Sequence, residues 1–275
     1  MHPLTKTKMI YRAFGLNIAS AISFLDMTQT EGVPDVVITY GKTPASLSDP
    51  KISGVRYQAG PGEFLLQVDN VARYYVANGN HILIERESGA ADEAVLLFLM
   101  GSAMGAILHQ RNILPLHGSS IKVDHEGVIF VGPSSIGKST LAGGFHKRGY
   151  PLLADDVCAV TAENGGGPHI IPGFPKLKLW ADALKKLEKD REGLYRVRLD
   201  QAFEKYFVPF DSAENGPVPV RSVFILIHII TIVVDAILAF RESDTHKPYA
   251  ICQTLPPFAP SLQLRHSTAY LQPLP

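Results

Sequence analysis

Short runs of alternating apolar and polar residues dominate the first ninety residues of the chain. A period of two is typical of strands that bury one face and expose the other. Glycine, proline and asparagine separate the runs, as expected for tight turns. The pattern therefore predicts a mostly β N-terminal domain over residues 1–90. The strands expected within it are residues 36–40, 64–68, 73–76 and 81–85.

The period changes after this region. Residues 92–110 are apolar at nearly every helical position, a pattern that indicates a helix buried on most sides. Small residues within it, such as Gly101 and Gly105, allow another backbone to approach closely. We expect residues 91–112 to form a connecting buried helix between the N-terminal domain and the rest of the chain.

From residue 113 onward, strand-like and helix-like patterns alternate. This alternation implies an α/β core that binds ligands at the carboxyl ends of its strands. We assign the core to residues 113–226 and expect a chain that is α+β over its whole length. The expected strands are residues 121–124, 127–131, 151–154, 157–161 and 220–227, and the expected helices are residues 138–147 and 180–190.

One apolar run, residues 223–240, is just long enough to be considered as a membrane span. It contains His228 and Asp235, and an aspartate near a helix centre costs about 2.5–3.5 kcal/mol on insertion scales. Its many β-branched residues suit buried strands instead. The sequence favours a strand or strand pair with no membrane partner, and the membrane span is the alternative.

Composition excludes several classes of protein. The 26 basic and 26 acidic residues cancel, so no bulk positive field points to nucleic acid. The two cysteines, Cys158 and Cys252, lie far apart and form no metal-binding motif, which argues against a disulfide scaffold or a structural zinc site. Residues 1–10 show no signal-peptide pattern. We expect a cytoplasmic protein.

The strongest motif is Gly-Pro-Ser-Ser-Ile-Gly-Lys-Ser at residues 132–139, which matches GxxxxGK[ST] at every fixed position. Glycines let the loop turn its N–H groups toward phosphate oxygens, while Lys138 reaches the β- and γ-phosphates and the Ser139 hydroxyl ligates Mg²⁺. The following helix adds its positive N-terminal end. The motif predicts a site for ATP and Mg²⁺. Its expected residues are Gly132, Pro133, Ser134, Ser135, Ile136, Gly137, Lys138, Ser139 and Thr140.

Two adjacent carboxylates, Asp155 and Asp156, lie between apolar runs. A charged group between buried strands needs a partner or a metal. Phosphoryl transfer needs one carboxylate near Mg²⁺ and another to accept the proton of the attacking hydroxyl. His117 precedes a further strand candidate, and although most isolated histidines are structural, a histidine can tune a neighbouring carboxylate.

These motifs together resemble the catalytic domain of the HPr kinase/phosphorylase family, whose P-loop is similar to that of phosphoenolpyruvate carboxykinases. The resemblance implies an ATP-dependent serine kinase. Asp155 would be the general base with His117 supporting it, Asp156 and Ser139 would lie on the Mg²⁺ side, and Lys138 would hold phosphate. The motifs that carry the resemblance are His117-Gly118, Gly132 to Ser139, and Asp155-Asp156.

A weaker likeness covers residues 172–180, which together with the N-terminal region look closest to the HPr-kinase-like proteins of lasso-peptide clusters. It implies a peptide or small-protein partner carrying a serine, with the C-terminal serine of a precursor as acceptor. Family members assemble, which implies a homo-oligomer. Lys176 and Lys178 either steady substrate charge or are exposed lysines on a strand edge.

The chain departs from the family in three places. Its loop reads Pro133-Ser134-Ser135, the glycine-rich second signature of the bifunctional enzymes is missing, and an apolar, proline-rich segment occupies residues 227–275. That segment reflects either divergence or an altered reading frame. Three alternatives therefore stay open: a kinase of HPr, a kinase of free serine, and a non-catalytic ATP-binding regulatory protein.

Overall fold

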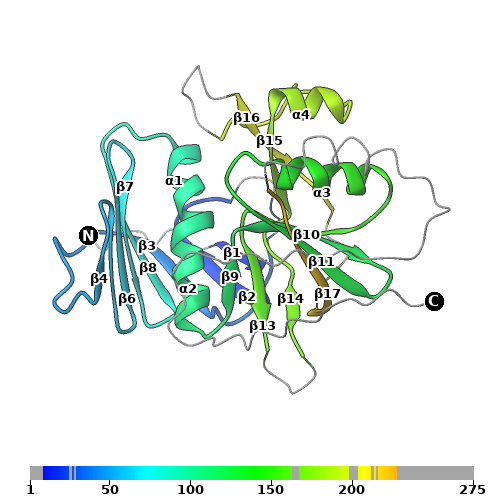
Figure 1. Ribbon diagram of the computed structural model, residues 1–275. Helices are drawn as coiled ribbons and strands as arrows, with labels where there is room; N and C mark the ends of the chain where they lie inside the picture. Colours follow the sequence, from blue (N-terminus) through cyan, green and yellow to red (C-terminus); the bar gives the residue numbers. More distant parts are fainter. Residues whose placement is uncertain are drawn as a thin grey trace.

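A helical segment lies between two β-sheets in the computed structural model (Figure 1). The structure describes residues 9–24, 27, 29–162, 167–197, 204–211, 214 and 216–227. The fold is therefore a mixed α/β one, with several sheets and short helices. Residues 228–275 lie outside the described residues. They include His228, Asp235 and Cys252, most of the apolar run 223–240, and all but the first residue of the segment 227–275.

The N-terminal sheet has the strand order β1-β2-β3-β8-β7-β6-β5-β4. Four strands lie within one residue of the predicted ends, namely β3, β6, β7 and β8. The alternation missed β1, β2, β4 and β5. Among these, β2 is buried at four of its five positions and β4 is exposed at both. The strands are β1 (Met9–Ala13), β2 (Leu16–Ser20), β3 (Val36–Tyr40), β4 (Ile52–Ser53), β5 (Tyr57–Gly60), β6 (Glu63–Val68), β7 (Ala72–Ala77) and β8 (His81–Arg86).

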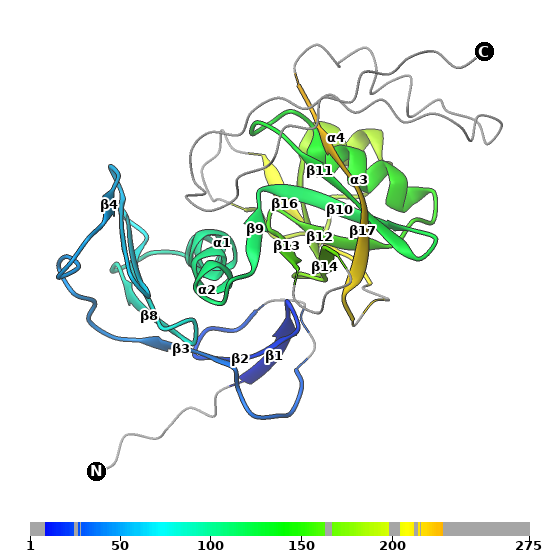
Figure 2. The ribbon, with the colours of Figure 1, turned by 60° about the horizontal axis from the view of Figure 1, so that its bottom comes forward.

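The helical segment comprises α1 (Asp92–Phe98), the π-helical turn η1 (Leu99–Ala103) and α2 (Met104–Gln110). Figure 2 shows it nearly end-on, with the N-terminal sheet curving around one side. Its apolar residues share one core with that sheet, and the Tyr74 hydroxyl donates to the Val95 carbonyl at 2.9 Å. Length and composition alone would allow Asp92–Gln110 to cross a membrane, a test that core helices of soluble proteins also pass.

The second sheet has the order β12-β10-β11-β17-β14-β13-β9. Only β11 and β17 pair in parallel, and its other pairs are antiparallel. The sheet is therefore mixed. Its strands are β9 (Leu114–Leu116), β10 (Gly118–Val123), β11 (Glu126–Val131), β12 (Leu152–Asp155), β13 (Cys158–Thr161), β14 (His169–Ile171) and β17 (Val218–Ile225).

One face of this sheet packs against α3 (Lys138–Lys147), whose bounds are those predicted. Beside α3 lies a small unit made of β15 (Lys176–Trp180), α4 (Ala181–Lys186) and β16 (Lys205–Pro209). The helix expected over residues 180–190 is shorter, because Trp180 still pairs with Lys205 as a strand residue and α4 ends at Lys186. Leucines of α3, β15 and α4 share one apolar core with the sheet.

Candidate active site

The loop between β11 and α3 has the backbone conformation that the motif requires. Gly132 has φ +150°, and a Cβ there would lie 2.5 Å from the Leu226 carbonyl oxygen. Gly137, with φ +102°, precedes the first turn of α3. Ser135 is also left-handed, at φ +66°. Since left-handed backbone strains residues with a Cβ, the two glycines are needed for the shape of the loop.

This loop fits a phosphate group. The Lys138 ammonium donates to the carbonyl oxygens of Gly132 and Pro133, at 2.8 Å each, which holds it over the loop. No described side chain caps the first turn of α3, so its N–H groups are available to an anion. Burial lowers the pKa of Lys138, although Asp155 and Asp156 oppose the shift.

Asp155 is buried at the end of β12 and is held by protein donors on both oxygens. Ser119 lies directly opposite it on β10, and the Ser119 hydroxyl donates to Oδ1 at 2.5 Å. The backbone N–H of Lys178 donates to Oδ2 at 2.7 Å. Burial raises the pKa of Asp155, while these two bonds and a hydrogen bond from the Ser139 side chain oppose the rise. Asp155 is thus linked to the P-loop serine.

Asp156 has different surroundings, although it is the next residue. Its φ of +70° lies outside the extended region, so β12 ends at Asp155. The Asp156 side chain is 27% exposed. The Lys178 ammonium lies 2.6 Å from its Oδ2. Burial favours the neutral acid, but the charge and hydrogen bond of Lys178 outweigh burial and lower the pKa of Asp156.

His117 contacts Asp156. Its Nδ1 lies 3.1 Å from the Asp156 carbonyl oxygen and 3.7 Å from Oδ1 of the same residue. The resemblance to the kinase family assigned His117 to Asp155 instead, whose two oxygens are held by Ser119 and Lys178. The turn at Asp156 explains the difference, because it brings that residue toward the end of β9.

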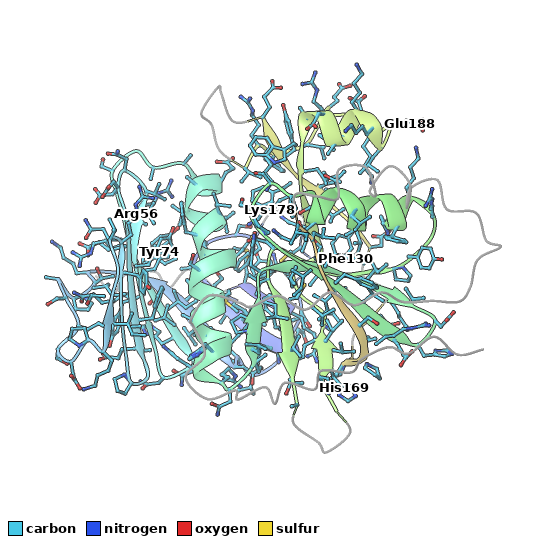
Figure 3. All side chains as sticks on the ribbon, viewed as in Figure 1. Arg56, Tyr74, Phe130, His169, Lys178 and Glu188 are labelled. Atoms are coloured by element: carbon cyan, nitrogen blue, oxygen red, sulfur yellow. The ribbon has the colours of Figure 1, made fainter. Side chains whose placement is uncertain are left out.

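Most of these groups face one cavity of about 380 Å³. Ser134 to Thr140 line it together with both carboxylates and His117, while Gly132 and Pro133 contribute through their carbonyl contacts with Lys138. Figure 3 shows Lys178 at the junction between the helical segment and the second sheet. The cavity is also lined by residues that the sequence motifs did not identify, namely Trp180, Asp182, Lys186 and Lys205.

Lys176 and Lys178 are both 6% exposed, which excludes the alternative of exposed lysines on a strand edge. Both ammonium groups lie 5.8 Å from the centre of the Phe207 ring on β16. Ser119 was also missed, and its only sequence signal was its place two residues after His117 on a strand that pairs with β12.

Among the described residues, no cluster of three histidine, cysteine, aspartate or glutamate side chains could hold a metal ion. A site with few protein ligands fits Mg²⁺, because Mg²⁺ keeps several waters and binds phosphate oxygens rather than occupying an all-protein cage. Ser139 and Asp155 are the side chains suited to hold it, because they meet beside the loop that fits phosphate.

Comparisons with known proteins give little beyond this geometry. No family model and no curated protein matches the chain. Among solved structures, the Hpr(Ser) kinase/phosphatase from Coxiella burnetii matches with a TM-score of 0.24 and 17% identity, over 46% of this chain and 93% of that chain.

Proposed function

We propose that this chain is an ATP-dependent kinase that transfers the γ-phosphoryl group to a serine hydroxyl of a peptide or protein. One observation carries the proposal. The phosphate-binding loop and two carboxylates with different surroundings face the same cavity. Phosphoryl transfer requires these parts, because catalysis consists of positioning the phosphates, neutralising charge and accepting one proton.

The residues divide the work as follows. The loop N–H groups and Lys138 hold the β- and γ-phosphates. Asp155 and Ser139 hold Mg²⁺, which neutralises phosphate charge when bound. Asp156 accepts the proton of the serine hydroxyl while that oxygen bonds to the γ-phosphorus, and His117 and Lys178 keep its carboxylate in place.

This division reverses the roles of the two aspartates that the family resemblance implied. Two features of the site support the reversal. Asp155 is buried, with both oxygens held by Ser119 and the Lys178 backbone, while the Asp156 side chain is partly exposed. A general base must come within hydrogen-bond reach of the hydroxyl that it deprotonates, and Asp156 is the more accessible of the two.

The acceptor that we propose is the C-terminal serine of a lasso-type precursor peptide. This choice depends on the likeness of residues 172–180 to kinases of that kind. HPr and free serine are the alternatives within the same chemistry. A non-catalytic ATP-binding regulator is a different class, and it has no need for a carboxylate that faces the cavity with a histidine beside it.

Intact-mass measurement after incubation with Mg-ATP tests the proposal. The acceptors are a precursor peptide ending in serine, the same peptide ending in alanine, HPr and free serine. We expect one added phosphoryl group on the serine-ending peptide alone. Transfer to HPr or free serine would keep the kinase and replace the acceptor, whereas ATP binding without transfer to any acceptor would favour the regulator.

A further inference from the structure

Lys205 lines the same cavity as the P-loop. It is the first residue of β16 and pairs with Trp180, the last residue of β15. Its ammonium lies over the indole ring of Trp180, 5.6 Å from the ring centre. No described carboxylate lies within 4.0 Å of that ammonium. A half-buried lysine held only by a ring retains donors for an anion.

The charge of Lys205 acts on the catalytic groups. It lowers the pKa of Lys138 on the loop side and the pKa of Asp156. Burial lowers the pKa of Lys205 itself, and Asp155 and Asp156 oppose that shift. Lys205 and Lys138 both line this cavity.

The charges in the cavity indicate which anion this lysine serves. Four lysines and three aspartates line it, a net of one positive charge; they are Lys138, Lys178, Lys186, Lys205, Asp155, Asp156 and Asp182. Mg-ATP brings about two negative charges. The nucleotide therefore brings enough negative charge to match the positive charge of the lining. Its phosphates are the anion that we assign to Lys205.

We propose that Lys205 is a catalytic residue that binds an oxygen of the phosphoryl group during transfer, a role that rests on the kinase function proposed above. In this step the serine oxygen bonds to the γ-phosphorus and its proton passes to Asp156. The bond from phosphorus to the β–γ bridging oxygen breaks, and ADP leaves with that electron pair. Lys205 turns from the Trp180 ring to the equatorial oxygens, where transition-state charge is spread.

Binding of a transition-state analogue tests this role without an acceptor. Trp180 is the single tryptophan of the chain, so its intrinsic fluorescence reports on this wall alone. The full chain with Mg²⁺ is titrated with ADP and then with ADP plus aluminium fluoride. For the native protein we expect the analogue to bind at least about 100-fold more tightly than ADP and to change Trp180 emission, since interactions made only in the transition state favour such analogues.

The variants are Lys205→Gln, Lys205→Arg and, as a matched control, Lys189→Gln, which changes an exposed lysine outside the cavity. We expect Lys205→Gln to bind ADP within about 5-fold of the native protein and to lose about 100-fold in affinity for the analogue. Lys205→Arg should recover most of that loss. This recovery would show that the loss in Lys205→Gln comes from the missing charge and not from misfolding. Lys189→Gln should match the native protein.

Two outcomes would overturn the assignment. If Lys205→Gln keeps the full preference for the analogue, the kinase proposal survives and Lys205 only packs on Trp180. If the native protein itself binds ADP and the analogue equally, the transfer chemistry fails, and the role of Lys205 fails with it. The two failures are distinguished by the native titration, which is made first.

Discussion

The ammonium of Lys178 lies 2.6 Å from Oδ2 of Asp156. The backbone N–H of the same lysine donates to the neighbouring carboxylate, Asp155, at 2.7 Å. One residue of β15 therefore positions both acidic groups, one through its backbone and one through its charge. This relationship separates their environments and leads to the first three predictions.

The two aspartates should lose different functions when each is replaced by asparagine. Asp156→Asn should slow transfer by about 10²–10⁴-fold, the usual contribution of a general base, while Mg-ATP binding stays nearly intact. Asp155→Asn should weaken the Mg²⁺-dependent part of ATP binding. Single-turnover rates and calorimetric titrations with and without Mg²⁺ measure the two effects. The opposite pattern would restore Asp155 as the base.

Lys178→Met should destabilise the protein by about 3 kcal/mol, because it leaves Asp156 charged and largely enclosed without its partner. Urea denaturation measures the loss. Asp156→Asn in the same chain should recover part of it, since the uncompensated charge is then removed. Additive losses in the double variant would mean that the pair is not coupled.

The same pair gives a pH dependence of known sign. Because the pKa of Asp156 is lowered in the folded protein, the pair stabilises the fold fully above the ordinary aspartate pKa of about 3.9. That stabilisation is lost only as the pH falls through the lowered value. The difference in unfolding free energy between the native protein and Asp156→Asn, which has no titrating group at this position, should thus stay constant from pH 7 to about pH 5 and shrink below it. A difference that shrinks near pH 6 would contradict this sign.

Gly132→Ala should abolish phosphate binding and reduce stability, because its Cβ would overlap the Leu226 carbonyl oxygen. Gly149→Ala is the matched control, since Gly149 also has positive φ, +93°, but open space around it. Backbone strain alone predicts a loss of about 1 kcal/mol for the control. Thermal melts and ATP titrations compare the two, and equal losses would exclude the steric explanation.

The Cys158 thiol should be inert in the folded protein. It is fully buried, and burial raises its pKa to about 12, so almost no thiolate exists at pH 8. In a Cys252→Ser chain, iodoacetamide should label Cys158 only after urea unfolding, as intact mass would show. Rapid labelling of the native chain would mean that this part of the second sheet opens readily.

The sequence by itself determined the parts of the protein that depend on neighbouring residues. The bounds of α3 follow from the helical spacing at residues 138–147, the left-handed glycines follow from the loop motif, and strands such as β3 follow from alternation. Each of these is set by backbone dihedral angles and hydrogen bonds over a few residues. The contiguous motif was therefore sufficient to locate the glycine-containing loop between β11 and α3.

Tertiary structure alone decided which partners each carboxylate has. His117 is 39 residues from Asp156, Ser119 is 36 from Asp155, and Lys178 is 22 from Asp156. Strand register decides these pairs, because adjacent residues of a strand point to opposite faces and a shift of one residue exchanges them. Tertiary structure also decides the left-handed turn at Asp156. It likewise decides the pairing of β15 with β16, which brings Lys205 into the cavity. Local pattern cannot fix contacts between distant segments, since those form only when whole elements pack.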